Sequence, residues 1–158
     1  MGYKVALLAN LKKNAPHHPG EPPDAHADLD SESTMLAIQA ALESRGHRVT
    51  FLEGGRNLPS DLSRLRPDIA FNVCEGHQGD SREAQVPALL EMLGIPYTGS
   101  KVLTLALTLD KPMTKRVLAY AGIRTPAFQV FERGDEPLGG NLSYPLFVKP
   151  SREGTGMG

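Results

Sequence analysis

The sequence lacks several features that would each point to a particular class of protein. It has no tryptophan, one cysteine and few aromatic residues, which make up 6% of the 158 residues. A single cysteine excludes an internal disulfide framework and fits a reducing compartment, so we expect a cytoplasmic protein. No apolar run approaches the roughly 20 residues of a membrane span, and the first residues become polar too soon for a signal peptide.

An excess of charge of one sign is also missing. Seventeen Lys and Arg residues nearly balance 18 Asp and Glu residues, which leaves a formal net charge of −1. A chain this close to neutral has no general electrostatic attraction to nucleic acid or to an anionic membrane, so we expect neither as a partner. The composition is otherwise globular, with 40% hydrophobic residues and enough length to bury a core.

The first part of the chain alternates between apolar segments and helical patterns. Three segments are rich in Val, Ile, Leu or Phe without strict alternation, as buried parallel strands are: residues 3–9, 47–52 and 68–74. Apolar residues at helical spacing predict helices over residues 31–45 and 81–93, and a fourth short strand is expected over 95–98. This alternation predicts an α/β fold with a doubly wound parallel sheet.

The pattern changes near residue 100. Residues 103–109 and 111–120 predict two consecutive helices, with Asp110 as the cap between them. Strands are then expected over residues 128–131 and 145–148. We therefore predict a first α/β domain over residues 1–100 and the opening of a second, α+β domain over residues 101–158.

Residues 10–30 form an unusually long segment without a clear pattern. The segment follows the carboxyl end of the first strand, where open α/β sheets place their ligands, so it is either a lid over a substrate site or a mobile surface excursion. Its histidines and acids could ligate a metal or could simply be polar loop residues, since their spacing matches no zinc pattern: His17, His18, His26, Asp24 and Asp28.

A glycine-rich segment follows the last expected strand. Lys149 ends that strand and is followed by a loop rich in Gly, Ser and Thr. Bare backbone N–H groups in such a loop can approach an anion closely, while the lysine ammonium supplies the countercharge. The pattern indicates a site for the phosphates of a nucleotide.

Four short motifs stand in the chain over residues 71–76 (FNVCEG), 94–100 (GIPYTGS), 108–111 (TLDK) and 147–154 (FVKPSREG). In this order and spacing they resemble the motifs of the D-alanine–D-alanine ligases and their ATP-grasp relatives. Each motif alone is weak, but their joint occurrence is specific. Since such enzymes are about twice this length, the resemblance implies an N-terminal substrate domain followed by an incomplete ATP-grasp domain.

The resemblance also implies a reaction and its groups. Enzymes of this kind use ATP to phosphorylate a substrate carboxylate, and an amine then attacks the acyl phosphate to form an amide. The positions that match the family's ATP-binding residues are Lys111, Lys149, Glu153, Gly154, Thr155 and Gly156. Thr155 also stands where the family carries a serine whose hydroxyl helps to hold the substrate. Mg²⁺ is implied with ATP, with its ligands expected beyond residue 158.

Two departures from the family affect the substrate. The D-alanine ligases carry a His-Gly pair after the third strand, whereas this chain has Glu75-Gly76. Glu75 is therefore either a substrate contact or a loop-end acid. The family's glycine-rich turn after the first strand is replaced by the segment of residues 10–30, with Glu32 as the candidate acid for an amino-acid ammonium. Arg82 and Glu83 form either a surface pair or a support for the Glu75 loop.

The resemblance leaves alternatives open. The fold could serve a non-catalytic module that binds amino acids or a partner, or a peptide ligase of the glutathione-synthetase type. Cys74 is either a buried small hydrophobic residue or, with no base partner defined by the sequence, a nucleophile. The ligase reading implies ATP and amino-acid-like substrates and is compatible with a homodimer. By itself, the 158-residue chain is expected to be inactive.

Overall fold

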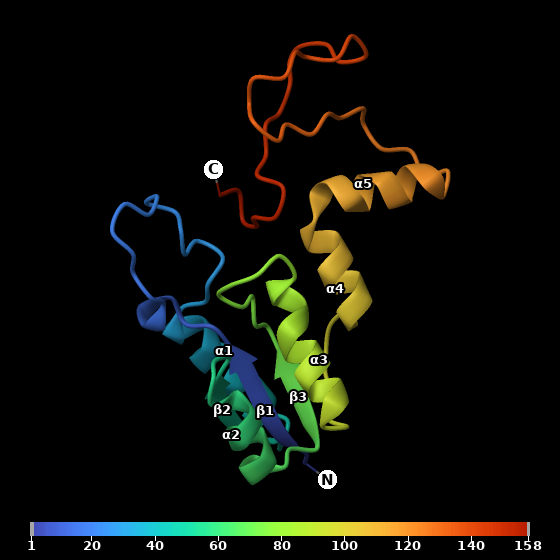
Figure 1. The fold of residues 1–158 in the computed structure, drawn as a ribbon. Coiled ribbons are helices and arrows are strands. Elements are labelled where there is room, and N and C mark those ends of the chain that lie inside the picture. The colour runs from blue at the N-terminus through green and yellow to red at the C-terminus, as the bar shows by residue number, and fades with distance from the viewer. Residues whose placement is uncertain (1, 158) are drawn as a thin grey trace.

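The computed structural model describes residues 2–157, and a three-stranded parallel sheet lies at its centre. The strands are β1 (Lys4–Ala9), β2 (Arg48–Glu53) and β3 (Ile69–Asn72), in the order β2-β1-β3. Val5 is paired with Val49 of β2 and with Ile69 of β3. All three strands therefore point the same way, and the predicted α/β fold with a parallel sheet is confirmed (Figure 1).

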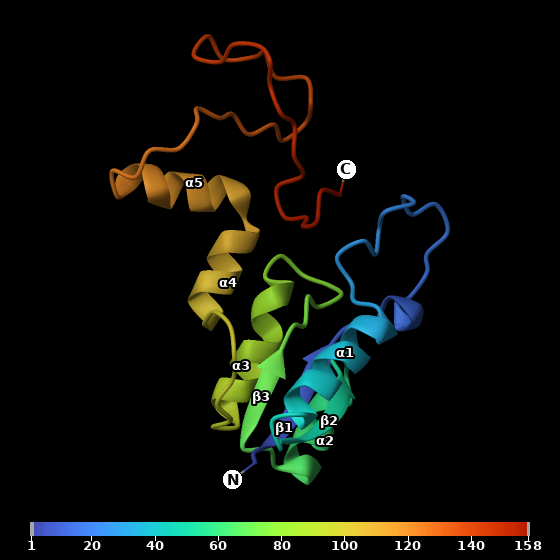
Figure 2. The same ribbon diagram turned by 180° about the vertical axis from the view of Figure 1, so that it is seen from behind.

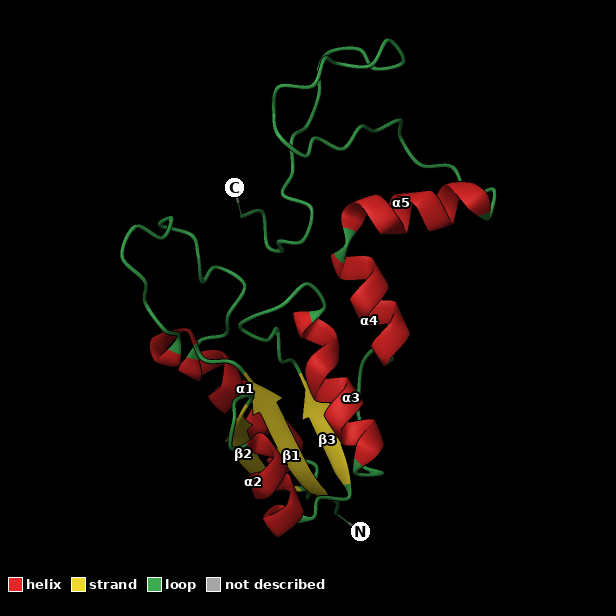
Figure 3. Cartoon of the chain, viewed as in Figure 1, coloured by secondary structure: helices red, strands yellow, loops and turns green. Residues whose placement is uncertain are grey.

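Helices cover both faces of this sheet (Figure 3). On one face, Leu7 and Ala9 of β1 pack with Met35 of α1 (Glu32–Glu43). On the other face, Ala6 and Leu8 pack against α2 (Leu58–Leu65) and α3 (Gln85–Met92). Because β1 contacts helices on both sides, its sequence is an unbroken apolar run rather than an alternating one.

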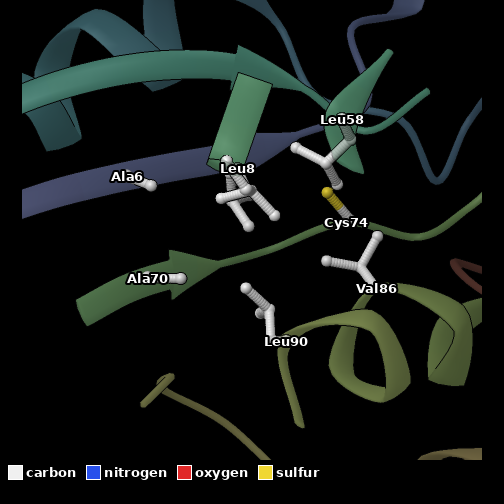
Figure 4. Close-up of a cluster of buried hydrophobic side chains, with 8 residues drawn as sticks. Ala6, Leu8, Leu58, Ala70, Cys74, Val86 and Leu90 are labelled. Carbon is white, nitrogen blue, oxygen red and sulfur yellow. The ribbon is translucent and has the colours of Figure 1, made fainter. Parts of the chain in front are cut away.

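The second face holds the larger core cluster, which Figure 4 shows in close-up. Leucines from α2 and α3 meet the small side chains of the sheet there, and the sulfur of Cys74 points into the same cluster. The buried members of the cluster are Ala6, Leu8, Leu58, Leu62, Ala70, Cys74, Val86 and Leu90. Cys74 is thus a buried hydrophobic residue, as one of the two sequence interpretations proposed.

Local signals account for the boundaries of several helices. The Ser31 hydroxyl accepts a hydrogen bond from the backbone N–H of Thr34 at 3.1 Å, which is the expected N-cap of α1. A 3₁₀ turn, η2 (Arg82–Ala84), leads into α3, so the predicted helix over 81–93 is present with a tighter first turn. Helix α2 was not predicted, because Gly54-Gly55 and Pro59 gave its segment the character of a loop.

The expected fourth strand is reduced to a single bridge. Tyr97 forms an isolated parallel bridge with Ala70 of β3. The Ala70 N–H donates to the Pro96 carbonyl at 2.8 Å, and the Thr98 N–H donates back to Ala70 at 3.0 Å. Pro96 has no backbone N–H to donate, which limits how far this edge can pair.

The last part of the chain leaves the sheet. Helices α4 (Val102–Leu109) and α5 (Lys111–Tyr120) follow each other, and Asp110 caps α5 by accepting from the Met113 N–H at 2.9 Å. Both helices are where the sequence predicts them. The described residues after α5 form coil (Figure 2).

The two strands expected over residues 128–131 and 145–148 were wrong. Neither segment pairs with another strand among the described residues, and Phe147 and Val148 are each 86% exposed. A strand exists only where a neighbour completes its ladder of hydrogen bonds, so strand-like composition alone is insufficient.

Residues 10–30 are less irregular than expected. The segment begins with a short 3₁₀ helix, η1 (Lys12–Asn14), and its two ends are joined by a parallel bridge between Leu11 and Asp30. The Asp30 N–H donates to the Asn10 carbonyl at 3.0 Å. The segment is therefore a loop closed at its base. Among the described residues, no helix is both long and apolar enough to cross a bilayer.

Candidate functional site

Three segments that lie far apart in the sequence meet beyond the carboxyl ends of the strands. The loop of residues 10–30, the loop that follows β3, and Arg152-Glu153 line a cavity of about 440 Å³. Figures 1 and 2 show the first two of these segments above the sheet, with the C-terminal coil over them. This is the edge at which parallel α/β folds bind their ligands.

Asn10 joins the ends of all three strands. It directly follows β1 and is 1% exposed. Its Nδ2 donates to the Gly54 carbonyl after β2 at 2.6 Å, and its Oδ1 accepts from the Gly76 N–H after β3 at 2.8 Å. Its Nδ2 also lies 3.1 Å from His77 Nε2. Asn10 therefore fixes the relative positions of the loops that form the site.

Two glycines allow this close approach. A Cβ on Gly54 would lie 2.6 Å from the sulfur of Cys74 and 2.9 Å from Asn10 Nδ2. Gly76 has a φ of +74°, and a Cβ there would lie 2.7 Å from the Arg82 carbonyl oxygen. The Glu75-Gly76 pair thus needs its glycine for both conformation and space.

Arg82 connects the three segments around the cavity. Its side chain is only 11% exposed. Its guanidinium donates to the Arg152 carbonyl at 2.9 Å and to Glu153 Oε2 at 2.8 Å, and lies 3.4 Å from Asp28 Oδ2 in the loop of residues 10–30. The sequence left open whether Arg82 is part of a surface pair. In the structure its side chain is largely buried and contacts all three segments, so it is not part of a surface pair.

Glu75 and Glu83 form an acidic pair in a second, smaller cavity of about 120 Å³. Burial, followed by the charges of Glu83, Asp28 and Asp30, raises the pKa of Glu75 to about 7, against an opposing effect of Arg82. Burial also raises the pKa of Glu83, which shares a hydrogen bond with Glu75. The pair therefore favours holding a proton or a neighbouring cation.

The glycine-rich segment docks on the start of α5. The Lys111 N–H donates to the Ser151 carbonyl at 3.0 Å, and the Lys111 ammonium donates to the Glu153 carbonyl. Arg152 is paired with Asp110 and with Asp80, each at 2.9 Å. These contacts bring Lys111 and the segment of residues 151–156 together, although they are about 40 residues apart in sequence.

Lys149 and Thr155 occupy less constrained positions. The Lys149 side chain is exposed, and its ammonium lies 4.9 Å from the centroid of the Phe147 ring. Thr155 has a φ of +48°, followed by Gly156 at +74°. A left-handed conformation is uncommon for a β-branched residue and is a form of local backbone strain. Thr155 and Gly156 are both exposed.

Glu32 lies apart from this group. It is in the first turn of α1 and forms an ion pair with Lys13 at 2.8 Å, with both side chains more than half exposed. Neither of the two cavities is lined by Glu32. Of the residues singled out from the sequence, the structure brings together Glu75, Lys111 and Glu153, with Arg82 and Glu83 between them.

Sequence reasoning missed two functional positions. Asn10 carried a usable signal, because a polar residue directly after a buried parallel strand faces the ligand-binding edge. The sequence suggested that Asp28 is either a metal ligand or a polar loop residue, whereas its carboxylate lies 3.4 Å from Arg82 and its side chain is 8% exposed. Nothing local to Asp28 indicates a partner 54 residues away.

Comparisons with known proteins bear on this arrangement. No family model matches the chain. It is 43% identical over 125 residues to a D-alanine–D-alanine ligase of Syntrophotalea carbinolica, covering 79% of this chain and 40% of that protein. It is 39% identical over 153 residues to one from Caulobacter sp. strain K31, covering 95% and 47% respectively.

Solved structures agree on the fold. A D-alanine–D-alanine ligase from Bacillus anthracis, determined in complex with ATP, has a TM-score of 0.60 and 21% identity to the chain. That similarity covers 88% of this chain and 43% of the other. The chain thus shares the fold of these ligases over most of its length.

In sequence, the chain is similar to D-alanine–D-alanine ligases over most of its own length, and the resemblance seen in its motifs is confirmed. The chain spans between 38% and 47% of the length of the curated relatives it matches.

Proposed function

We propose that the protein is an ATP-dependent carboxylate–amine ligase of the D-alanine–D-alanine ligase type. The chain would supply the N-terminal substrate domain, residues 1–100, and part of the nucleotide-binding domain, residues 101–158. The observation that carries the proposal is the meeting of Lys111, the glycine-rich segment and the Glu75–Glu83 pair around Arg82, in a chain related to such ligases.

The residues of the glycine-rich segment fit a polyphosphate. Lys111 and Lys149 would provide ammonium groups, and Gly154 and Gly156 provide backbone that an anion can approach closely. Bound ATP would transfer its γ-phosphoryl group to the substrate carboxylate, so that amine attack forms the amide and releases phosphate. Lys111 now donates to the Glu153 carbonyl, so we propose that phosphate oxygens replace that carbonyl as its acceptor.

The acidic pair fits the ammonium group of an amino-acid substrate. A cation beside Glu75 and Glu83 would offset their mutual repulsion and favour their ionised forms. The left-handed Thr155 would relax when the segment closes over the nucleotide, bringing its hydroxyl toward the substrate. Glu32 remains the second candidate for an ammonium contact, although it now pairs with Lys13.

The remaining parts of the proposal come from the family resemblance of the motifs. Mg²⁺ would accompany ATP. Amino-acid-like substrates, a cytoplasmic location, a role in making cell-wall precursors and pairing into a homodimer complete the picture.

The experiment is a measurement of phosphate release by the purified full-length protein, of which residues 1–158 form a part under this proposal, with ATP, Mg²⁺ and a panel of D- and L-amino acids. Release that requires at least one amino acid is expected, and mass spectrometry should detect the dipeptide. Lys111→Ala should lower kcat/KM by about 100-fold because it removes charge from the transition state. Lys101→Ala, at an exposed position before α4, is the matched control and should change activity less than twofold.

Two results would contradict the proposal. One is phosphate release that does not respond to any amino acid; the other is equal activity of Lys111→Ala and Lys101→Ala. A dipeptide other than D-alanyl-D-alanine would retain the ligase class and reassign the substrate. Residues 1–158 produced alone are expected to form no ADP, because the chain covers about two fifths of the related ligases.

A further inference from the structure

Three side chains in the loop of residues 10–30 that the proposed ligase function does not use converge beside the 440 Å³ cavity. His17 Nδ1 lies 2.8 Å from Glu21 Oε1, and His26 Nε2 lies 3.3 Å from the same oxygen. The two imidazole rings are edge-to-face, with centroids 5.1 Å apart and planes inclined by 79°. One ligand atom from each of the three residues lies within 4.8 Å of the others.

These separations suit a single bound ion. A tetrahedral ion about 2.0–2.1 Å from each ligand holds its ligand atoms about 3.3 Å apart. The Glu21–His26 separation of 3.3 Å already meets that requirement, and the Glu21–His17 separation of 2.8 Å needs to open by a few tenths of an ångström.

His26 supplies an independent indication. Its Nε2 is buried and lies 3.3 Å from Glu21 Oε1, yet it makes no hydrogen bond, and its side chain is 15% exposed. Leaving a buried polar nitrogen unsatisfied costs about 1–3 kcal/mol, so such an atom calls for an explanation. A metal ion placed between His26 and Glu21 would satisfy that nitrogen directly.

The Glu21 carboxylate is already oriented to bind an ion between the two imidazoles. Glu21 Oε2 accepts a hydrogen bond from the backbone N–H of His18 at 3.0 Å, which leaves Oε1 facing both imidazoles. Hydrogen bonds to the non-ligating oxygen of a carboxylate are a regular feature of the outer shell of metal sites. His18 thus contributes its backbone, while its own ring is outside the group.

We propose that His17, Glu21 and His26 form a binding site for a divalent transition-metal ion of the zinc class. Two imidazoles and one carboxylate are ligands that Zn²⁺, Co²⁺ or Ni²⁺ accepts readily, whereas Mg²⁺ prefers oxygen ligands alone. Three protein ligands leave a fourth position for water. Its ligands differ in kind from the oxygen ligands that Mg²⁺ bound with ATP would take.

The position of the site gives it a structural consequence. His26 lines the 440 Å³ cavity, together with Pro16, Ala25 and Asp28 from the same loop. An ion joining His17 to His26 would close this part of the loop into a ring and hold that wall of the cavity in place. Asp28, which pairs with Arg82, follows two residues later. The ion would therefore order the loop that faces the proposed ligase site.

The test is direct metal binding to the purified metal-free protein, measured by calorimetry with Zn²⁺ and by the visible absorption of Co²⁺. One Zn²⁺ per chain is expected to bind with a Kd of about 10 µM or less, and Co²⁺ should show the intense bands of a tetrahedral site. His26→Ala and Glu21→Gln should each weaken Zn²⁺ binding at least tenfold. His18→Ala, which keeps the backbone N–H to Glu21, is the matched control and should bind normally.

Hydrogen exchange supplies a second readout that does not depend on affinity. Zn²⁺ should slow exchange of the backbone amides between residues 16 and 27 in the wild-type protein and in His18→Ala, but not in His26→Ala. The proposal is overturned if Zn²⁺ fails to bind at 100 µM, or if His26→Ala and Glu21→Gln bind it as well as His18→Ala does. Far-ultraviolet circular dichroism establishes that each variant is folded before binding is compared.

Discussion

The first 100 residues and the remainder of the chain differ in how they obtain their structure. In the first region, β1 is buried between helices on both faces, and two core clusters surround it. In the second region, Leu109 is the one described residue that is buried. The first region is held by packing between elements distant in sequence. In the second region, α5 has a side-chain cap, Asp110, whereas α4 has none and lies against η2 and α3 of the first region.

Contacts between charged groups link the two regions. Arg82 and Asp80 from the first region bind Glu153 and Arg152 of the second, while Asp110 and Lys111 hold the same segment from α5. Such links are weaker and more sensitive to pH than apolar packing. The candidate site therefore combines a well-packed base with a cover, residues 151–156, that is attached mainly through charged groups.

The largest expected effect contrasts two leucines on helices. Leu62 in α2 is 1% exposed and Leu103 in α4 is 78% exposed. Leu62→Ala should lower the free energy of unfolding by about 3–4 kcal/mol because it leaves a cavity in the core. Leu103→Ala should change it by less than about 0.5 kcal/mol, as exposed substitutions do. Urea denaturation measures both, and similar losses would show that α4 is buried in solution.

The second effect concerns Arg82, which links the two regions. Arg82→Ala leaves the buried Asp28 carboxylate and Glu153 without their shared partner and should cost about 2–3 kcal/mol. The substitution should also speed proteolysis within residues 152–157, because this segment loses its contacts with Arg82. Arg64→Ala removes an exposed ion pair with Asp61 and is the matched control, with a loss below about 1 kcal/mol. Equal behaviour of the two variants would remove Arg82 as the link.

The same contrast explains which predictions from the sequence succeeded. The sequence correctly predicted strands β1, β2 and β3 and helices α1 and α5. Their signals, buried apolar runs and caps such as Ser31 and Asp110, depend only on residues close together in the sequence. The strands expected over 128–131 and 145–148 failed because strand formation requires a partner, which composition does not reveal. Helix α2 was missed because loop-forming residues masked its leucines.

The candidate site follows the same rule. The glycine-rich segment and Lys111 were recognisable as motifs, whereas the hydrogen bond between them joins residues 42 apart. Asn10 and Arg82 reach partners 66 and 71 residues away, respectively. Position along a strand can suggest that a residue faces the site, but which side chain it meets there depends on how the loops pack.

The third effect tests the acidic pair through pH. The pKa of Glu75 is raised from 4.5 to about 7, so its folded form binds a proton more tightly than its unfolded form. Its contribution to stability is complete below pH 4.5 and is lost as pH rises through 7. Glu75→Gln stays neutral and should be more stable than wild type at pH 8 by about 1 kcal/mol, a value reduced for partial solvent screening.

Denaturation curves of the two proteins at pH 4, 6 and 8 test this directly. The stability difference between Glu75→Gln and wild type should widen with pH, and a constant difference would contradict the raised pKa. Glu91→Gln is the control for the loss of an exposed carboxylate, because Glu91 bonds only the Tyr97 hydroxyl at the surface in the contacts described. Its difference from wild type should not follow the same trend.

The smallest effect separates two roles of Asp110 in the second region, the cap of α5 and the ion pair with Arg152. Asp110 accepts from the Met113 N–H and is paired with Arg152, and both contacts lower its pKa. Asp110→Ala removes both and should lower α5 stability by about 0.5–1 kcal/mol, whereas Asp110→Asn retains the cap and loses only the charge. Hydrogen exchange of α5 amides should therefore be faster in Asp110→Ala than in Asp110→Asn. Equal exchange in the two variants would mean that the Arg152 contact, rather than the cap, holds the start of α5. The second region would then depend on its contact with residues 151–156 more than on the cap of its own helix.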